Sequence, residues 1–73
     1  MNIQQSSTID KLSDRETEIL QHMADGLSSR IIATVLGISE DTVETHRKNI
    51  YRKIDAKNAA QATAYGFRNN IIK

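Results

Sequence analysis

Signals that begin and end helices recur at short intervals along this chain, so it has room only for short helices. Ser13 and Glu16 have the spacing of a capping box, in which each side chain bonds a free backbone N–H at a helix start. Gly26 and Gly37 suit the left-handed position that follows a helix end, and Ser39 can cap the next helix soon afterwards. No segment alternates polar and apolar residues as a half-buried strand does. The pattern predicts an all-α domain of short, closely connected helices.

Apolar residues recur at helical spacing between these signals. Four helices are predicted: residues 14–25, a short helix that Ser28 or Ser29 caps and that runs to residue 36, residues 40–54, and a last helix that follows Asn58 and ends near Asn69 or Asn70. The apolar side of the second helix is expected to consist of Ile32, Ala33 and Leu36, with Ile31 and Val35 widening it.

The chain is short enough to form only one small domain, with 73 residues and no cysteine. A core of this size gives marginal stability. The lack of cysteine excludes disulfides and Cys-based zinc sites, and it suits a reducing compartment. No apolar run approaches the roughly 20 residues of a membrane span, and residues 1–7 do not resemble a signal peptide. We therefore expect a cytoplasmic protein with a flexible arm or linker at residues 1–11 and one domain at residues 12–73.

Charge is strongly divided along the chain, although the formal net charge is only +1. Residues 1–43 hold three basic and seven acidic side chains, a net charge of −4, whereas residues 44–73 hold seven basic and two acidic ones, a net charge of +5. A basic half can attract phosphate or an acidic partner. It can equally be a solvated helix surface that balances the acidic half. Charge alone leaves both interpretations open.

The short connection between the second and third predicted helices is typical of a helix-turn-helix, with Gly37 supplying the turn and Ile38 filling the angle between the helices. At about 100° per residue, residues 40–54 place an apolar stripe of Val43, Ile50 and Ile54 opposite a polar one. The polar side holds residue types that suit base edges in a major groove: Glu44, Thr45, Lys48, Asn49 and Arg52. The alternative is an ordinary solvent-facing helix.

Other side chains suit phosphate contacts better than base contacts. Arg47, Lys53 and Lys57 lie on the flanks and at the C-terminal end of the third predicted helix, which pass the DNA backbones when a helix enters a groove. Ser28 and Ser29 stand at the N-terminus of the second helix, a natural phosphate site, although both are also good caps.

No constellation of side chains in the sequence suits catalysis or metal binding. His22 and His46 lack the i, i+4 separation of a helical ligand pair, and no Cys or Glu completes a ligand set. We expect His22 at the surface or boundary of the first helix, and His46 at the edge of the core stripe or beside a phosphate. We predict a protein that is not an enzyme and that binds no metal, cofactor or small-molecule ligand in this domain.

Six segments together carry a family resemblance: residues 12–20 (LSDRETEIL), 26–28 (GLS), 32–33 (IA), 36–39 (LGIS), 42–46 (TVETH) and 49–54 (NIYRKI). They closely resemble the LuxR-type helix-turn-helix family, and the resemblance covers nearly everything except the N-terminal arm. It implies a four-helix DNA-binding domain of a transcription regulator, with a three-helix core and a C-terminal dimerisation helix.

Residue roles follow from the same resemblance. Glu44, Thr45 and Lys48 match the family's base-contacting positions, whereas Thr42 and His46 match recognition-helix positions near the DNA backbone. The resemblance also implies a homodimer that pairs through the last helix. The residues expected at that dimer interface are Ala59, Ala62, Thr63, Gly66 and Phe67.

The chain departs from the family pattern at several positions. Ile31 stands where a capping Glu is usual, and Asp55 replaces the usual Gly after the third helix. Glu44 occupies a base-facing position that is often Lys or Arg, so the DNA sequence that is read should differ. Thr63 and Gly66 replace apolar residues, which leaves the last helix a smaller apolar face for dimerisation.

The leading hypothesis is a sequence-specific DNA-binding transcription regulator that inserts the helix at about residues 40–54 into the major groove of double-stranded DNA. It would act as a homodimer on an operator of two half-sites, with RNA polymerase as a further candidate partner and no membrane contact. Two alternatives stay open. One is a DNA-binding module like region four of sigma factors, and the other is a protein-interaction module that uses the third and fourth helices.

Overall fold

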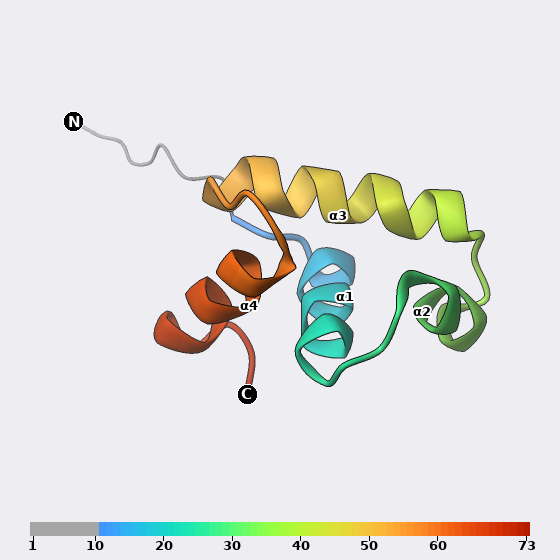
Figure 1. The fold of residues 1–73 in the computed structure, drawn as a ribbon, viewed down its shortest axis with the longest axis horizontal. Helices are drawn as coiled ribbons and strands as arrows, with labels where there is room; N and C mark the ends of the chain where they lie inside the picture. The colour runs from blue at the N-terminus through green and yellow to red at the C-terminus, as the bar shows by residue number, and fades with distance from the viewer. Residues whose placement is uncertain (1–10) are drawn as a thin grey trace.

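The computed structural model describes residues 11–73, so the predicted N-terminal arm lies outside the described residues except for Lys11. Four helices follow one another in this part of the chain, and it contains no strand (Figure 1). They are α1 (Asp14–Ala24), α2 (Ser29–Leu36), α3 (Glu40–Ile54) and α4 (Ala59–Arg68). The predicted all-α fold is confirmed. The predicted bounds of α3 match the observed ones, and the predicted C-terminal ends of α1 and α4 lie one or two residues beyond the observed ones.

Side-chain caps begin each helix where the sequence predicts them. The Ser13 hydroxyl accepts a hydrogen bond from the Glu16 backbone N–H at 3.1 Å, and the Glu16 carboxylate accepts one from the Ser13 N–H at 2.9 Å. This reciprocal pair is the predicted capping box. Ser28, Ser39 and Asn58 cap the other three helices in the same local way. Ser28, rather than Ser29, is therefore the cap of α2.

A residue in the left-handed conformation follows each of the four helices. Gly26 and Gly37 have φ values of 90° and 70° after α1 and α2. Asp55, which replaces the usual glycine after α3, also adopts the left-handed conformation with φ 55°. Aspartate tolerates this region better than most residues because its short polar side chain can bond locally. After α4, Asn70 has φ 57° and turns the chain back.

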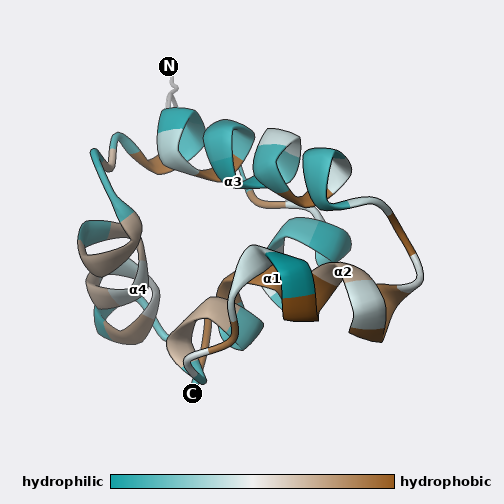
Figure 2. Ribbon diagram, turned by 45° about the vertical axis from the view of Figure 1, so that its right-hand side comes forward, coloured by the Kyte–Doolittle hydropathy of each residue, from teal (hydrophilic) through white to brown (hydrophobic). Residues whose placement is uncertain are grey.

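The core lies where α1 meets the other three helices. Figure 1 shows α3 along one side of the molecule with α1, α2 and α4 beneath it. The largest side chains that are almost completely buried there are Ile19, Leu20, Ile32, Val43 and Ile50. In Figure 2 the brown, hydrophobic side of α3 faces the other helices and its teal side faces outward. The predicted apolar stripe of α3 is therefore part of the core. Within residues 11–73, no helix has the length and apolar character needed to cross a membrane.

Ile31 and Val35 widen the apolar side of α2 in the sequence, but the structure does not bury them. Their side chains are 48% and 57% exposed, whereas Ile32 and Ala33 are buried. The reason lies in the arrangement of the helices. α2 packs against α1 and α3, and in the described part of the chain it makes no contact with α4, so its outer face stays uncovered.

The residues after α4 fold back against α1. Ile72 is buried, and a Cβ atom added to Gly66 would lie 2.9 Å from the Ile72 side chain. The Gln21 amide of α1 accepts a hydrogen bond from the Lys73 N–H and donates one to the Lys73 carbonyl, both at 2.9 Å. These contacts hold α4 against α1, and Gly66 leaves the space that the Ile72 side chain occupies.

Glu16 connects the start of α1 to α3. Besides its role in the capping box, its Oε1 atom accepts a hydrogen bond from Lys53 Nζ at 2.8 Å, and its side chain is only 6% exposed. Burial by itself would raise the pKa of Glu16. The hydrogen bonds from Lys53 and the Ser13 N–H, together with the positive charge of Lys53, outweigh burial and lower the pKa below its ordinary value of 4.5.

We expect Glu16→Gln to lower the free energy of unfolding by about 1–2 kcal/mol at pH 7, because it removes a charged hydrogen-bond acceptor from Lys53. Since the folded-state pKa is lowered, the ionised Glu16 stabilises the protein fully above about pH 4.5, and this stabilisation is lost as the pH falls through the folded-state value. Urea unfolding of both proteins between pH 7 and pH 3 should show the difference shrinking below pH 4.5. Glu18→Gln is the control, since Glu18 forms only an exposed pair with Arg15 at 3.5 Å. A difference that stays constant over this pH range would contradict the role of Glu16.

Candidate nucleic-acid interface

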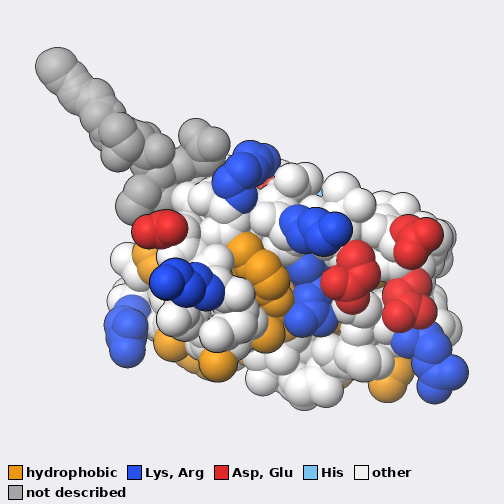
Figure 3. Space-filling model, turned by 45° about the horizontal axis from the view of Figure 1, so that its top comes forward, with side chains coloured by type: hydrophobic (Ala, Val, Ile, Leu, Met, Phe, Trp, Pro, Cys, Tyr) orange, Lys and Arg blue, Asp and Glu red, His pale blue; other side chains and the backbone are white. Residues whose placement is uncertain are grey.

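The outer side of α3 presents a continuous polar surface. Of the predicted base contacts, Glu44, Thr45, Lys48 and Arg52 are exposed there, and Asn49 is half-buried at the edge. Acidic side chains gather toward the N-terminal end of α3, and basic ones lie along its middle and its C-terminal end (Figure 3). Each sign of charge lies at the end of the helix where the helix dipole favours it. The structure thus brings the predicted base contacts together on one face, and their contact with bases stays a prediction.

Asn49 and Arg52 form a linked pair on this face. Arg52 Nη2 donates a hydrogen bond to Asn49 Oδ1 at 3.3 Å, across the i, i+3 spacing of a helix. This bond orients the Asn49 amide so that its NH₂ group remains available as a donor. The two side chains can therefore act on a ligand together.

The seven predicted phosphate contacts divide into two groups. Ser28, Thr42 and Lys57 are exposed, although the first two also serve helix caps: the Ser28 hydroxyl caps α2, and the Thr42 hydroxyl lies 2.8 Å from that of Ser39. The remaining four are half-buried or buried and lie closer to the body of the domain: Ser29, His46, Arg47 and Lys53.

Two of the predicted phosphate-binding cations are engaged within the protein. Lys53 Nζ bonds Glu16, as described above. Arg47 Nη1 donates a hydrogen bond to Ser29 Oγ at 2.9 Å, and its Nη2 donates one to the Tyr51 hydroxyl at 3.1 Å. Ser29 is only 7% exposed, so its hydroxyl faces Arg47 rather than open solvent. Arg47 and Lys53 thus already have partners inside the domain, unlike a cation that only contacts solvent.

Tyr51 was not among the predicted site residues. The sequence does indicate that Tyr51 can contact Arg47, because residues four apart on a helix share one face. The partner on α2, Ser29, lies 18 residues from Arg47 in the chain. No local pattern indicates that contact.

The predicted dimer residues on α4 do not share one surface. Ala62 is 0% exposed and Gly66 is buried against Leu20 and Ile72, so both belong to the core of this domain. Both are covered within this domain, and the pairing of a second copy with α4 stays a prediction. The side chains that cover Gly66 are Leu20 of α1 and Ile72 of the tail after α4. Phe67 is 49% exposed, and Ala59 and Thr63 are half-buried.

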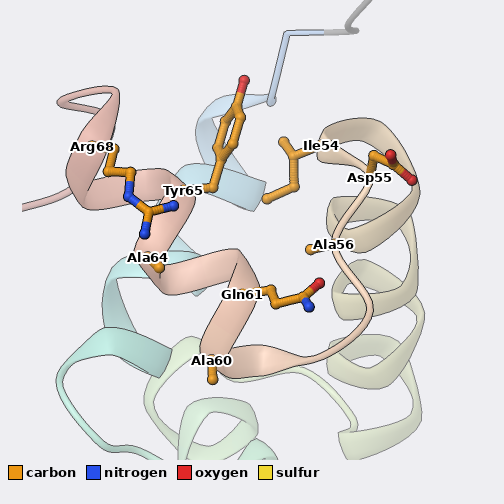
Figure 4. A pocket seen from close by; sticks show the side chains of 8 residues that line it. All are labelled: Ile54, Asp55, Ala56, Ala60, Gln61, Ala64, Tyr65 and Arg68. Carbon is orange, nitrogen blue, oxygen red and sulfur yellow. The ribbon is translucent and has the colours of Figure 1, made fainter.

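A hollow of about 450 Å³ lies between the C-terminal end of α3 and the outer face of α4 (Figure 4). Alanine side chains form much of its wall, and its only charged lining residues are Asp55 and Arg68. It contains neither histidine, and within residues 11–73 no group of three or more His, Asp or Glu side chains is placed to hold a metal ion.

The two histidines lie on different helices. His22 is half-buried near the end of α1, where its Nε2 atom is buried without a hydrogen-bond partner, and His46 is half-buried on α3. Both positions agree with the boundary locations expected from the sequence. The contact of His46 with a phosphate stays a prediction.

Residues 10–65 match the family model of bacterial regulatory proteins of the luxR family. The chain is 59% identical over 61 residues to the HTH-type quorum-sensing regulator RhlR of Pseudomonas aeruginosa. These residues make up 84% of this chain and 25% of RhlR.

Two solved structures share the fold. The response regulator ChrA of a heme-sensing two-component system superposes with a TM-score of 0.84 at 42% identity, over 92% of this chain and 33% of ChrA. The regulatory protein SdiA of Escherichia coli, in complex with octanoyl-rac-glycerol, superposes with a TM-score of 0.73 at 42% identity, over 85% of this chain and 25% of SdiA. The chain therefore spans about a quarter to a third of the length of these relatives.

Proposed function

Because the chain belongs to the luxR family of bacterial regulatory proteins, we propose that it is the sequence-specific DNA-binding part of a transcription regulator. The observation that carries the proposal is the exposed polar face of α3, on which Glu44, Thr45, Lys48 and Arg52 project from one helix beside a tight turn. The same membership confirms the prediction that the chain is not an enzyme.

The dimensions of α3 suit a major groove. Its 15 residues extend about 22 Å, and a major groove about 12 Å wide admits one such helix. The apolar side of α3 is held on the core, so the helix can enter the groove only with its polar side. Lys48 then donates to guanine, Glu44 accepts from cytosine, and the Thr45 methyl group meets a thymine methyl group.

Phosphate contacts come from the two ends of this surface. Lys57 lies beyond the C-terminal end of α3, and Ser28 and Thr42 lie at the first turns of α2 and α3. We assign Arg47, Lys53 and His46 to the same group of side chains that face the DNA backbone, with Arg47 and Lys53 held by partners inside the domain. Ser29, which is buried, takes part through its hydrogen bond with Arg47. Such contacts fix the register of the protein without reading sequence.

The complete regulator is proposed to bind as a homodimer to two half-sites in bacterial cytoplasm, with RNA polymerase as its further partner. In this proposal a second copy pairs with the accessible side of α4, which includes Phe67, Ala59 and Thr63. One domain would then occupy each half-site, with the half-sites about one helical turn of DNA apart or a multiple of it.

The test of this function is selection of random-sequence duplexes on the purified chain, with sequencing of the retained pool at two salt concentrations. We expect an enriched motif that persists at the higher salt concentration. An inverted repeat would support dimeric binding, and a single half-site would support a monomeric reader. Retention without enrichment, lost at high salt, would contradict sequence-specific binding. No retention at either salt concentration would favour a protein-interaction module instead.

We expect Lys57→Ala to weaken binding to all duplexes by a similar factor, because Lys57 is assigned to a phosphate. The slope of log K against log salt concentration should fall by about one, since one fewer counterion is released. Fluorescence anisotropy at several salt concentrations, with the selected duplex and a scrambled one, measures both quantities. A loss confined to the selected duplex would assign Lys57 to a base.

A further inference from the structure

The Arg47 side chain joins two helices through one guanidinium group. Its Nη1 atom reaches Ser29 Oγ in the first turn of α2, and its Nη2 atom reaches the Tyr51 hydroxyl one turn further along α3. Ser29 is 7% exposed, and the half-buried Tyr51 ring packs against the core. Both partners are therefore held in place by the body of the domain.

Two hydrogen bonds, donated by separate nitrogen atoms, fix the orientation of the guanidinium plane. A guanidinium group has five N–H donors, so these two bonds leave others free for a further acceptor. The first turn of α2 does not itself attract the guanidinium, since the positive end of a helix dipole opposes a cation. The hydrogen bonds from Arg47 to Ser29 and Tyr51 thus hold a positive charge beside the N-terminus of α2. An anion at this place would be stabilised by both the guanidinium group and the helix dipole.

We infer that Tyr51 and Ser29 are positioning residues that hold the Arg47 guanidinium ready for a DNA phosphate. The inference rests on the proposed function and deepens it, because it names the residues that position the proposed phosphate contact of Arg47. A free arginine side chain loses rotamer freedom when it binds, and a side chain that is already ordered avoids most of that loss. Tyr51 then raises affinity for DNA without touching it.

The test is a double-mutant cycle with Tyr51→Phe and Arg47→Gln on the whole chain. Tyr51→Phe removes one hydroxyl group and keeps the ring that packs on the core. We expect it to weaken binding of the selected duplex about fivefold, the effect of one ordinary hydrogen bond. In the Arg47→Gln background the same change should weaken binding less than about twofold, because Tyr51 acts only through Arg47.

Two controls separate positioning from a general structural effect. Tyr65→Phe alters the other tyrosine of the chain, which lies on α4 outside this hydrogen-bond network, and should leave binding unchanged. NMR of the arginine side-chain N–H groups in the free protein provides a readout without DNA. The Arg47 signals should be protected from solvent exchange in the parent protein and lose that protection in Tyr51→Phe.

The possible failures are distinguishable. If the parent protein binds no duplex, the proposed function is wrong and the inference falls with it. If the parent protein binds its selected duplex and Tyr51→Phe binds equally well, or weakens binding by the same factor in both Arg47 backgrounds, the proposed function stands and the positioning role of Tyr51 is wrong.

Discussion

Lys48→Ala is expected to weaken binding of the selected duplex by about 1–3 kcal/mol, roughly 5- to 150-fold in Kd, and to relax base preference at one position. Lys48 lies on the exposed side of α3, on the stripe opposite the buried Val43 and Ile50. An ammonium group there can donate to guanine O6 and N7, and alanine leaves those acceptors without a partner in a dehydrated groove. The measurement is Kd at one fixed salt concentration for the selected duplex and for its single-base variants.

Lys57→Ala serves as the matched control for this result, since it removes the same side chain from a position assigned to a phosphate. The two variants should differ in kind. Lys48→Ala flattens the preference for one base pair, whereas Lys57→Ala lowers affinity for every duplex by a similar factor. If both variants lost affinity equally on selected and scrambled duplexes, the assignment of Lys48 to a base would be wrong.

Ile50→Ala is expected to lower the free energy of unfolding by about 2–5 kcal/mol, since it deletes a completely buried side chain and leaves a cavity. Small domains have only about 5–15 kcal/mol in total, so the variant should be close to unfolding at moderate temperature. Ile50 lies on the apolar stripe of α3, so the loss also loosens the support of the proposed DNA-reading face. Urea unfolding followed by circular dichroism measures the loss.

Ile31→Ala is the matched control, because it makes the same chemical change at a side chain that is 48% exposed. We expect its effect to lie within about 0.5 kcal/mol, as for most surface substitutions. A loss as large as that of Ile50→Ala would mean that Ile31 is buried in solution, as the apolar pattern of α2 suggested.

The sequence by itself determined the helices and the polar face of α3. Ser13, Ser28, Ser39 and Asn58 begin the helices, and Asp55 takes the left-handed position after α3. These features are predictable because caps and turns depend on residues within about four positions of one another. Helical periodicity likewise separated the buried side of α3 from its exposed side, since both depend only on the spacing of residues along one helix.

Only the tertiary structure decided which side chains remain free and which are engaged. Arg47 bonds Ser29 across 18 residues, Lys53 bonds Glu16 across 37, and Gln21 bonds Lys73 across 52. Packing also buried Gly66, which was expected at a dimer interface, and left Ile31 exposed, against the apolar pattern of α2. The local sequence shows which side of a helix can be buried, but it does not show which other helices cover that side. That depends on how the four helices pack, and the packing of this domain left Lys48 exposed while it drew Lys53 into an ion pair.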